Sequence, residues 1–259
     1  MRWLAIQQLK SSGTGMQVLD LFSGIGGMTV GLERAGMKTV AFCENDEYPS
    51  KVLKKNWPSV PVYNDVSTLT KGVLENDGIT VDVICGGWPC QDLSRAGRRG
   101  GIKAERSGLW KHYARLISEI RPKYAIMENS SALISGDTGR WLGSVLGDLA
   151  EIGYDLEWHC IPASYLGANH ERDRFWAIAY PMCEGLQGSE KAIYPRFQRA
   201  IRHELIARRF CSFDSLSTIE PTLCRGAHGI PSQSHRIKGL GNAVVPQIPE
   251  ILGRAILNE

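Results

Sequence analysis

The sequence predicts an α/β fold in which a parallel sheet carries helices on both faces. Strand-like and helix-like segments alternate from residue 17 to about 180, and such alternation is typical of a parallel sheet. The segment 81–85 is apolar enough to be a strand buried on both faces. Apolar residues make up 43% and charged residues 22% of the 259 residues, which is the composition of a globular protein rather than a disordered chain.

The expected strands are short apolar segments, at 18–22, 39–43, 61–63, 81–85, 123–127, 156–162 and 174–179. The expected helices are 27–35, 46–56, 107–120, 139–152 and an amphipathic C-terminal segment, 242–257, with prolines in its first turns. Gly36 and Gly153 stand where two helices should end, because glycine readily adopts the left-handed conformation at a helix C-terminus. Between 181 and about 235 the pattern gives way to Arg, Ser, Gly and Pro, with a helix-like stretch near 196–209.

The net charge is only +3, but basic residues are concentrated in two segments. Residues 95–111 carry a balance of +5 and residues 190–211 a balance of +4, which leaves 3 − 9 = −6 for the rest of the chain. Two basic segments on an acidic body suit a polyanion such as nucleic acid. Solvated surface segments would have the same composition, so charge alone leaves both interpretations open.

Several protein classes are disfavoured. No uninterrupted apolar stretch approaches the roughly 20 residues of a membrane span, and the N-terminus lacks a secretory signal. The seven cysteines form neither a Cys-x-x-Cys pair nor a zinc-binding spacing. We therefore expect reduced thiols, a cytoplasmic location and no metal site.

A Gly-rich turn follows the first strand, in the segment Asp20-Leu-Phe-Ser-Gly-Ile-Gly-Gly27. Glu44 ends the second strand and Asp65 follows the third, where acids can accept hydrogen bonds from a ribose and an adenine amino group. The phosphate-binding patterns G-x-G-x-x-G and G-x-x-x-x-G-K-[ST] are absent. A nucleoside cofactor without phosphates, such as S-adenosylmethionine, therefore suits these residues better than NAD or ATP, although a purely structural turn is the alternative.

The segment 82–94, Asp-Val-Ile-Cys-Gly-Gly-Trp-Pro-Cys-Gln-Asp-Leu-Ser, places Pro89 and Cys90 directly after a buried strand. Proline restricts the backbone beside it, so the Cys90 thiol should be held rigidly at the carboxyl edge of the sheet. The basic residues that follow favour the thiolate, which is the nucleophilic form. An isolated cysteine is more often an inert, buried residue, and that interpretation suits Cys85.

Two further sites follow later strands. Glu128 leaves the apolar segment 124–127, so burial should raise its pKa and make it a candidate proton donor. Arg172 and Arg174 are spaced by two residues and should project to one face of a strand. The alternatives are a helix cap or surface acid for Glu128 and a structural ion pair for the arginines.

Five motifs, in the same order and spacing, resemble those of the DNA (cytosine-5-)-methyltransferase family. They are DLFSGIGG, GGWPCQDLS, Glu128-Asn129-Ser130, His170-Glu-Arg172-Asp-Arg174 and Gly241-Asn242-Ala243-Val244-Val245-Pro246. The resemblance covers 17–180 and about 236–257. It implies a Rossmann-like, S-adenosylmethionine-dependent methyltransferase fold with residues 16–180 and 236–259 as the catalytic domain, 1–15 as an N-terminal extension and 181–235 as a short target-recognition region.

The resemblance also implies a reaction on a cytosine flipped out of double-stranded DNA. Cys90 would add to carbon 6, Glu128 would protonate ring nitrogen 3, and Arg174 with Arg172 would hold the carbonyl oxygen. Carbon 5 would take the methyl group of S-adenosyl-L-methionine, leaving S-adenosyl-L-homocysteine. Phe22 would lie against the adenine, Glu44 on the ribose, Asp65 on the adenine amino group, and Asn242 and Val244 at the methionine end. The other expected cofactor-binding residues are Ser23, Gly24, Gly26, Gly27, Asn45, Val66, Gly86 and Pro89.

DNA contacts are expected mainly from the basic segments. The residues expected to bind DNA are Gln91, Ser94, Arg95, Arg98, Arg99, Arg106, Arg199 and Arg202. Residues 95–111 resemble the family's mobile loop, which closes on DNA. We further expect a monomer in a bacterial or phage-encoded setting, with a cognate restriction endonuclease as a partner and no membrane association.

The sequence departs from the family at three places. Ser130 replaces a valine, and His170 replaces a glutamine. The variable region, residues 181–239, stands where family members usually have a larger target-recognition domain, and its 59 residues are too few to form a core of their own. It predicts a short or relaxed recognition sequence, a helper subunit or partial degeneracy.

Two other functions stay open, an RNA (tRNA) cytosine-5 methyltransferase and a catalytically inactive DNA-binding relative. A dinucleotide-dependent dehydrogenase is disfavoured because the dinucleotide-binding pattern G-x-G-x-x-G is absent.

Overall fold

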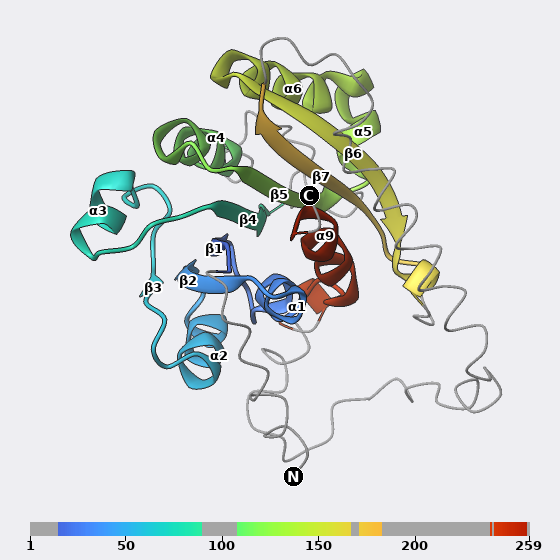
Figure 1. The fold of residues 1–259 in the computed structure, drawn as a ribbon. Coiled ribbons are helices and arrows are strands. Elements are labelled where there is room, and N and C mark those ends of the chain that lie inside the picture. The colour runs from blue at the N-terminus through green and yellow to red at the C-terminus, as the bar shows by residue number, and fades with distance from the viewer. Residues whose placement is uncertain (1–14, 90–107, 167–170, 183–238, 240, 258–259) are drawn as a thin grey trace, which may run out of the picture.

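The protein is described from a computed structural model, which places residues 15–89, 108–166, 171–182, 239 and 241–257. In these residues the strands form one sheet in the order β3-β2-β1-β4-β5-β7-β6 (Figure 1). Strands β1 to β5 run parallel, whereas β7 is antiparallel to both of its neighbours. The strands are β1 (Gln17–Leu21), β2 (Lys38–Cys43), β3 (Val62–Tyr63), β4 (Val83–Gly87), β5 (Tyr124–Ser130), β6 (Tyr154–Pro162) and β7 (Asp173–Pro181).

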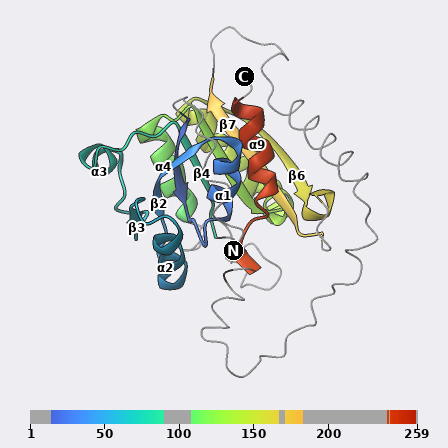
Figure 2. The same cartoon turned by 60° about the horizontal axis from the view of Figure 1, so that its bottom comes forward.

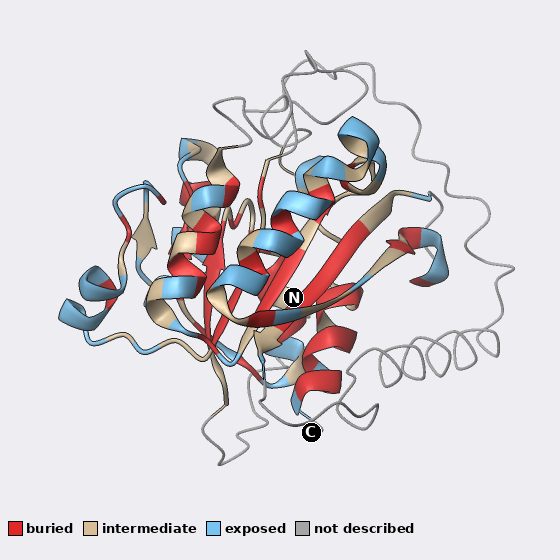
Figure 3. Ribbon diagram, turned by 90° about the horizontal axis from the view of Figure 1, so that it is seen from above, coloured by how far each residue is buried: buried red, intermediate tan, exposed pale blue. Residues whose placement is uncertain are grey.

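Helices cover both faces of this sheet, and their outward faces are exposed (Figure 3). The helices are α1 (Gly27–Ala35), α2 (Glu47–Asn56), α3 (Lys71–Asn76), α4 (Leu109–Ile120), α5 (Ala132–Ser135), α6 (Arg140–Ile152) and α9 (Gln247–Leu257), with the 3-10 turns η1 (Gly136–Gly139) and η2 (Ala163–Leu166). Helices α1 and α9 pack side by side, so the C-terminal segment lies beside the first helix (Figure 2).

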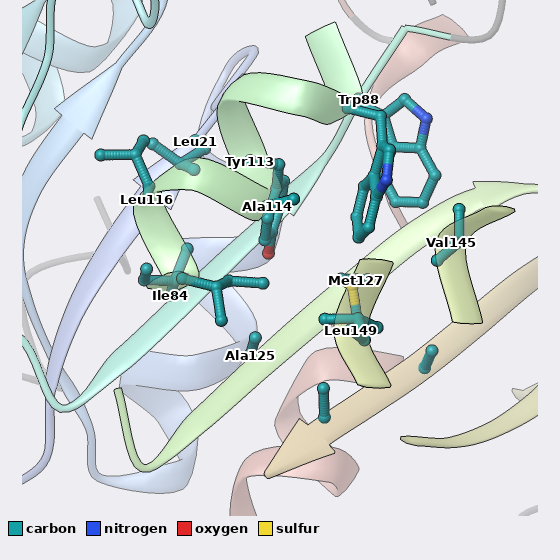
Figure 4. Packing of buried hydrophobic residues seen from close by; sticks show 14 of the residues in the cluster. Leu21, Ile84, Trp88, Tyr113, Ala114, Leu116, Ala125, Met127, Val145 and Leu149 are labelled. Carbon is teal, nitrogen blue, oxygen red and sulfur yellow. The ribbon is translucent and has the colours of Figure 1, made fainter. Parts of the chain in front are cut away.

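Alternate side chains of the central strands supply two hydrophobic cores. Leu19 and Leu21 belong to the core under α4 and α6, whereas Val18 faces the core under α1 and α9. Figure 4 shows the first core, in which Tyr113 of α4 lies over the sheet and its hydroxyl donates to the Ile126 carbonyl at 3.0 Å. Because both faces of the central strands are covered, their sequences are mostly apolar.

Most sequence-based boundaries agree with the structure to within a few residues. Gly36 and Gly153 end α1 and α6 in the left-handed conformation, with φ of 109° and 85°, as their positions predict. The six-residue helix α3 was not expected. Its sequence signal is Thr70, whose hydroxyl accepts from the Val73 N–H at 3.3 Å as an N-cap.

The expectation of a parallel sheet is wrong for β7, which runs antiparallel to its neighbours β5 and β6. Only residues 163–172 connect β6 and β7, and a parallel connection needs a crossover of a dozen or more residues. The expected C-terminal helix also starts later, because residues 243–246 are not helical and α9 begins at Gln247. The helix-like stretch near 196–209 lies outside the described residues.

Candidate active site

A cavity of about 760 Å³ opens at the carboxyl ends of β1, β2, β4 and β5, and Gly239 and residues 242–244 contribute to its lining. Its lining has two chemically different ends. We call the part with Asp20, Glu44 and Asp65 the acidic end, and the part with Glu128, Arg172 and Arg174 the arginine end. Ligand sites of open α/β sheets lie at this edge.

The Gly-rich turn of the acidic end bends sharply after β1. Phe22 and Gly24 both have a φ of 53°, and Gly26 has a φ of 86°. The Ser23 hydroxyl donates to the Asp20 carbonyl at 2.6 Å and fixes the turn. The Phe22 ring stacks toward Tyr113, with 6.4 Å between the ring centroids. The turn thus exposes Phe22, Ser23, Gly24 and Gly27 to the cavity.

Glu44 is held by the backbone on both of its carboxylate oxygens. Oε2 accepts from the Gly24 N–H at 2.7 Å, and Oε1 accepts from the Asp46 N–H at 2.8 Å. The residue is only 8% exposed. Each oxygen has a second lone pair, so Glu44 can accept two more hydrogen bonds from a ligand without moving.

Asp65 lies in the turn after β3 and also lines the cavity. Its Oδ1 accepts from the Ser67 N–H at 2.8 Å, and this hydrogen bond lowers the pKa of the Asp65 carboxyl. The neighbouring Val66 is buried. Both Val66 and Asn45 also line the cavity. Asp65 is therefore an ionised acceptor beside an apolar surface.

Asp20 lies at the floor of the acidic end and was not singled out from the sequence. Its Oδ2 accepts from the Thr29 hydroxyl at 2.7 Å, while Oδ1 has no hydrogen-bond partner among the residues that the structure describes. Burial raises the pKa of Asp20 from 3.8 to about 7, against the opposing effect of Thr29. The signal in the sequence is an acid inside an otherwise apolar, buried segment, between Leu19 and Leu21.

At the arginine end, Glu128 pairs with Arg174 across the sheet. The distance from Arg174 Nε to Glu128 Oε1 is 3.1 Å, and the two side chains are 29% and 13% exposed. Burial raises the pKa of Glu128 from 4.5 to about 7, although Arg174 and Arg172 act in the opposite direction. Glu128 is therefore partly protonated near neutral pH, as its position after an apolar strand predicts.

Arg172 does not lie on a strand, which corrects the expectation that both arginines project from one strand face. It precedes β7 with a φ of 30°, and its Nη1 donates to the Gly241 carbonyl at 2.6 Å. Asn242 and Val244 follow and line the cavity. Arg172 therefore connects the arginine end to the C-terminal segment.

Two of the expected cofactor-binding glycines do not line the cavity. A Cβ at Gly86 would collide with the Leu21 carbonyl, and one at Gly26 would meet the Trp57 ring at 2.8 Å. Both glycines permit close packing away from the cavity. The cavity lining does contain Pro89, together with Trp88.

Asn129 belongs to the motif that contains Glu128, and the structure shows that it anchors the chain before Pro89. It is 1% exposed, and its Nδ2 donates to the Trp88 carbonyl at 3.4 Å. Trp88 packs against Trp110, with 5.0 Å between the ring centroids. The chain leading to Pro89 is thus anchored from two sides.

Other predicted residues lie outside the described part of the chain. These are Cys90, Gln91, Ser94, Arg95, Arg98, Arg99, Arg106, Arg199 and Arg202, and the region 181–235 is described only for 181 and 182. Within the described residues, no group of three or more His, Cys, Asp or Glu side chains is arranged to hold a metal ion. No helix there is both long and apolar enough to cross a membrane.

The fold and the cavity define a Rossmann-like α/β protein of the methyltransferase type. A family model described as C-5 cytosine-specific DNA methylase matches residues 16–207, and the chain belongs to this family. The resemblance inferred from the five motifs is confirmed.

Among its relatives, the type II methyltransferase M.Eco47II of Escherichia coli is 37% identical over 174 residues, which are 66% of this chain and 41% of that protein. M.CviJI of Paramecium bursaria Chlorella virus IL3A is 37% identical over 164 residues, 63% of this chain and 42% of that protein. The chain thus spans about two fifths of the length of these relatives. M.AquIA of Picosynechococcus is 28% identical over 222 residues, 79% of this chain and 89% of that protein.

Solved structures share the fold at lower identity. An E. coli prophage protein described as a DNA modification methyltransferase has a TM-score of 0.65 at 21% identity, with 94% of this chain and 99% of that chain covered. A DNMT2 variant from Spodoptera frugiperda has a TM-score of 0.54 at 21% identity, with 68% and 53% covered. These comparisons concern the architecture alone.

Proposed function

We propose that this chain is a DNA (cytosine-5-)-methyltransferase that transfers a methyl group from S-adenosyl-L-methionine to carbon 5 of cytosine in double-stranded DNA. The observation that carries the proposal is the half-buried Glu128–Arg174 pair, set in the same cavity as the acidic end and beside the strand that leads to Pro89 and Cys90. Membership in the methylase family supports it independently.

The acidic end suits the cofactor. Among the described residues that line the cavity, the arginines are Arg172 and Arg174, both at the arginine end. Phosphates would favour cations beside the Gly-rich turn, whereas this turn is surrounded by carboxylates that suit ribose hydroxyls, an amino group and a sulfonium. Phe22 would hold the adenine, Glu44 the ribose, Asp65 with Val66 the adenine edge, and Asn242 and Val244 the methionine end.

The arginine end suits a cytosine ring. When bound, the cofactor supplies an electrophilic methyl group. Glu128, in its protonated form, would donate to ring nitrogen 3, and Arg174 would hold the carbonyl oxygen while it keeps the Glu128 carboxyl in place. The Cys90 thiolate would add to carbon 6, and its bond would break again when the carbon-5 proton leaves to a base.

The experiment is a methyl-transfer assay with radiolabelled S-adenosylmethionine and the purified chain. Duplex DNA and structured tRNA are offered in parallel, and Cys90→Ser is the control. Label in duplex DNA that is lost with Cys90→Ser is the expected result. Label confined to the tRNA would replace the proposal with an RNA methyltransferase, and full activity of Cys90→Ser would contradict the covalent route.

The setting that we propose is a cytoplasmic modification enzyme that acts as a monomer alongside a cognate restriction endonuclease. Its support is the set of relatives named as type II methyltransferases. Sequencing of DNA from cells that express the chain would locate the methylated base and test this setting. Methylation at a fixed sequence is expected, whereas unmethylated DNA would contradict it.

A further inference from the structure

One face of α4 carries three polar residues, His112, Arg115 and Glu119, that point toward the turn after β3. Their spacing of three and four residues places them on one side of the helix. The turn comprises residues 65–71, and Asp65 and Val66 at its start line the cavity. We call these three residues the α4 polar stripe.

Arg115 is the centre of the α4 polar stripe. Its Nη2 donates to the Val66 carbonyl at 2.9 Å and to the Leu69 carbonyl at 2.8 Å. Its Nη1 donates to Glu119 Oε1 at 2.6 Å. The planar guanidinium therefore spans two carbonyls of the turn and is itself held by a carboxylate, which a lysine could not reproduce.

The other two residues of the α4 polar stripe contact the ends of the same turn. Glu119 Oε2 accepts from the Lys71 N–H at 3.1 Å. His112 lies close enough to interact electrostatically with Asp65. Hydrogen bonds from one helix thus hold the turn at Val66, Leu69 and Lys71.

The position of Asp65 depends on these contacts. Its carbonyl accepts from the Thr68 and Leu69 N–H groups at 3.3 and 3.2 Å, so the turn is a single hydrogen-bonded unit. Arg115 contacts that unit at Val66 and Leu69, directly beside Asp65. A shift of the turn would move the Asp65 carboxylate, which lies at the surface and has no strand to hold it.

We propose that Arg115, oriented by Glu119, is a positioning residue that fixes the Asp65–Leu69 turn and so makes the cavity selective for an adenine ring. The inference rests on the proposed function, in which Asp65 accepts from the adenine amino group. A carboxylate held in place accepts well from that donor and disfavours a ring with a carbonyl oxygen there, because two acceptors would face each other. A loosely held carboxylate discriminates less.

The test compares the binding of S-adenosylhomocysteine and S-inosylhomocysteine, which differ at the exocyclic amino group, by isothermal titration calorimetry. The wild-type chain should prefer the adenosyl compound by about tenfold or more. Arg115→Lys keeps the charge but loses the planar guanidinium that donates to the Val66 and Leu69 carbonyls. It should reduce this preference at least threefold. Glu119→Gln should reduce it by a smaller factor, and it carries the test if Arg115→Lys fails to fold.

The matched control is Arg121→Lys, at the C-terminal end of the same helix. Arg121 also donates to a carbonyl, that of Ile152, but lies away from the cavity lining. Its replacement should leave the ratio of the two dissociation constants unchanged. A loss of stability alone would weaken both ligands equally.

The outcomes separate the inference from the proposed function. An unchanged ratio in folded Arg115→Lys, an equal weakening of both ligands, or a wild-type chain that binds both compounds equally would overturn the inference while S-adenosylhomocysteine still binds. A wild-type chain that binds neither compound would overturn the cofactor assignment, and the inference with it.

Discussion

Glu44 and Glu128 are two glutamates that lie at strand ends and line one cavity, yet their surroundings differ. Both oxygens of Glu44 accept from backbone N–H groups. Glu128 pairs with Arg174 on a single oxygen, and burial raises its pKa to about 7. The first carboxylate is a fixed acceptor, and the second can carry a proton.

This difference assigns separate chemical roles to two identical side chains. The two backbone N–H groups fix the orientation of the Glu44 carboxylate, which suits the binding of a ligand's hydroxyls. Desolvation stabilises the protonated form, which suits proton donation to a ring nitrogen. The role of each acid is therefore set by where the strand ends and by what lies opposite, as in other sites where two carboxyls divide the work.

The largest effect should come from Glu128→Gln. This change keeps the size of the side chain but removes the proton that we assign to ring nitrogen 3, so the methyl-transfer rate should fall by about 10²–10⁴-fold. The dissociation constant of S-adenosylhomocysteine, measured by calorimetry, should change less than about twofold because the acidic end is untouched. A large loss of cofactor affinity would remove the distinction between the two glutamates.

Glu44→Gln should have the converse effect. The amide presents one acceptor atom where Gly24 and Asp46 need two, so one N–H loses its partner and the ribose loses an acceptor. A loss of about 1.5–3 kcal/mol of binding free energy corresponds to a dissociation constant for S-adenosylhomocysteine that is roughly 10–100-fold larger. If the rate at saturating cofactor fell as far as with Glu128→Gln, Glu44 would not be confined to binding.

Gly87→Ala should disturb the arginine end alone. A Cβ at this position would lie 2.5 Å from Glu128 Oε2, so the carboxyl that pairs with Arg174 must shift. We expect the methyl-transfer rate to fall about tenfold or more, with cofactor affinity retained. A rate equal to that of the wild type would show that the position of the Glu128 carboxyl is not critical.

The control for Gly87→Ala is Gly143→Ala on α6. A Cβ there would meet no atom of the described residues within 4 Å, apart from the neighbouring backbone of α6 itself, and alanine is the better helix former. The free energy of unfolding should rise by about 0.5–1 kcal/mol without any change in rate.

The pH dependence of the free energy of unfolding tests the raised pKa of Asp20 at the acidic end. Its pKa is about 7 in the folded protein against 3.8 ordinarily, so the folded state binds the proton more tightly. Its contribution to stability is full below pH 3.8 and is lost as the pH rises through 7. Between about pH 5 and 6.5 the free energy of unfolding should fall by up to about 1.4 kcal/mol per pH unit.

The measurement is urea unfolding of the wild type and Asp20→Asn over this pH range. The slope attributed to Asp20 should disappear in the variant, because an amide does not titrate. Equal slopes in both proteins would assign the pH dependence to other groups, Glu128 among them.

Local signals in the sequence predicted the parts of the fold that short-range interactions determine. Gly36 and Gly153 end their helices as expected, and the raised pKa of Glu128 follows from the apolar residues before it. The antiparallel direction of β7 was missed, because strand direction depends on a connection rather than on the strand's own residues. The Arg172–Gly241 hydrogen bond joins residues 69 apart in the chain, and the Arg115 contacts cross 46 and 49 residues. No spacing rule reveals such pairs.

The central claim, that this cavity performs covalent methyl transfer to cytosine, is tested most directly with duplex DNA containing 5-fluorocytosine. In this base, fluorine replaces the carbon-5 hydrogen that must be removed as a proton before Cys90 can leave. The bond between Cys90 and carbon 6 should therefore persist after methyl transfer. With S-adenosylmethionine present, we predict a protein–DNA complex that survives denaturing electrophoresis for the wild type and is absent for Cys90→Ser. Failure of the wild-type chain to form this complex, while it binds both the cofactor and the DNA, would contradict the account.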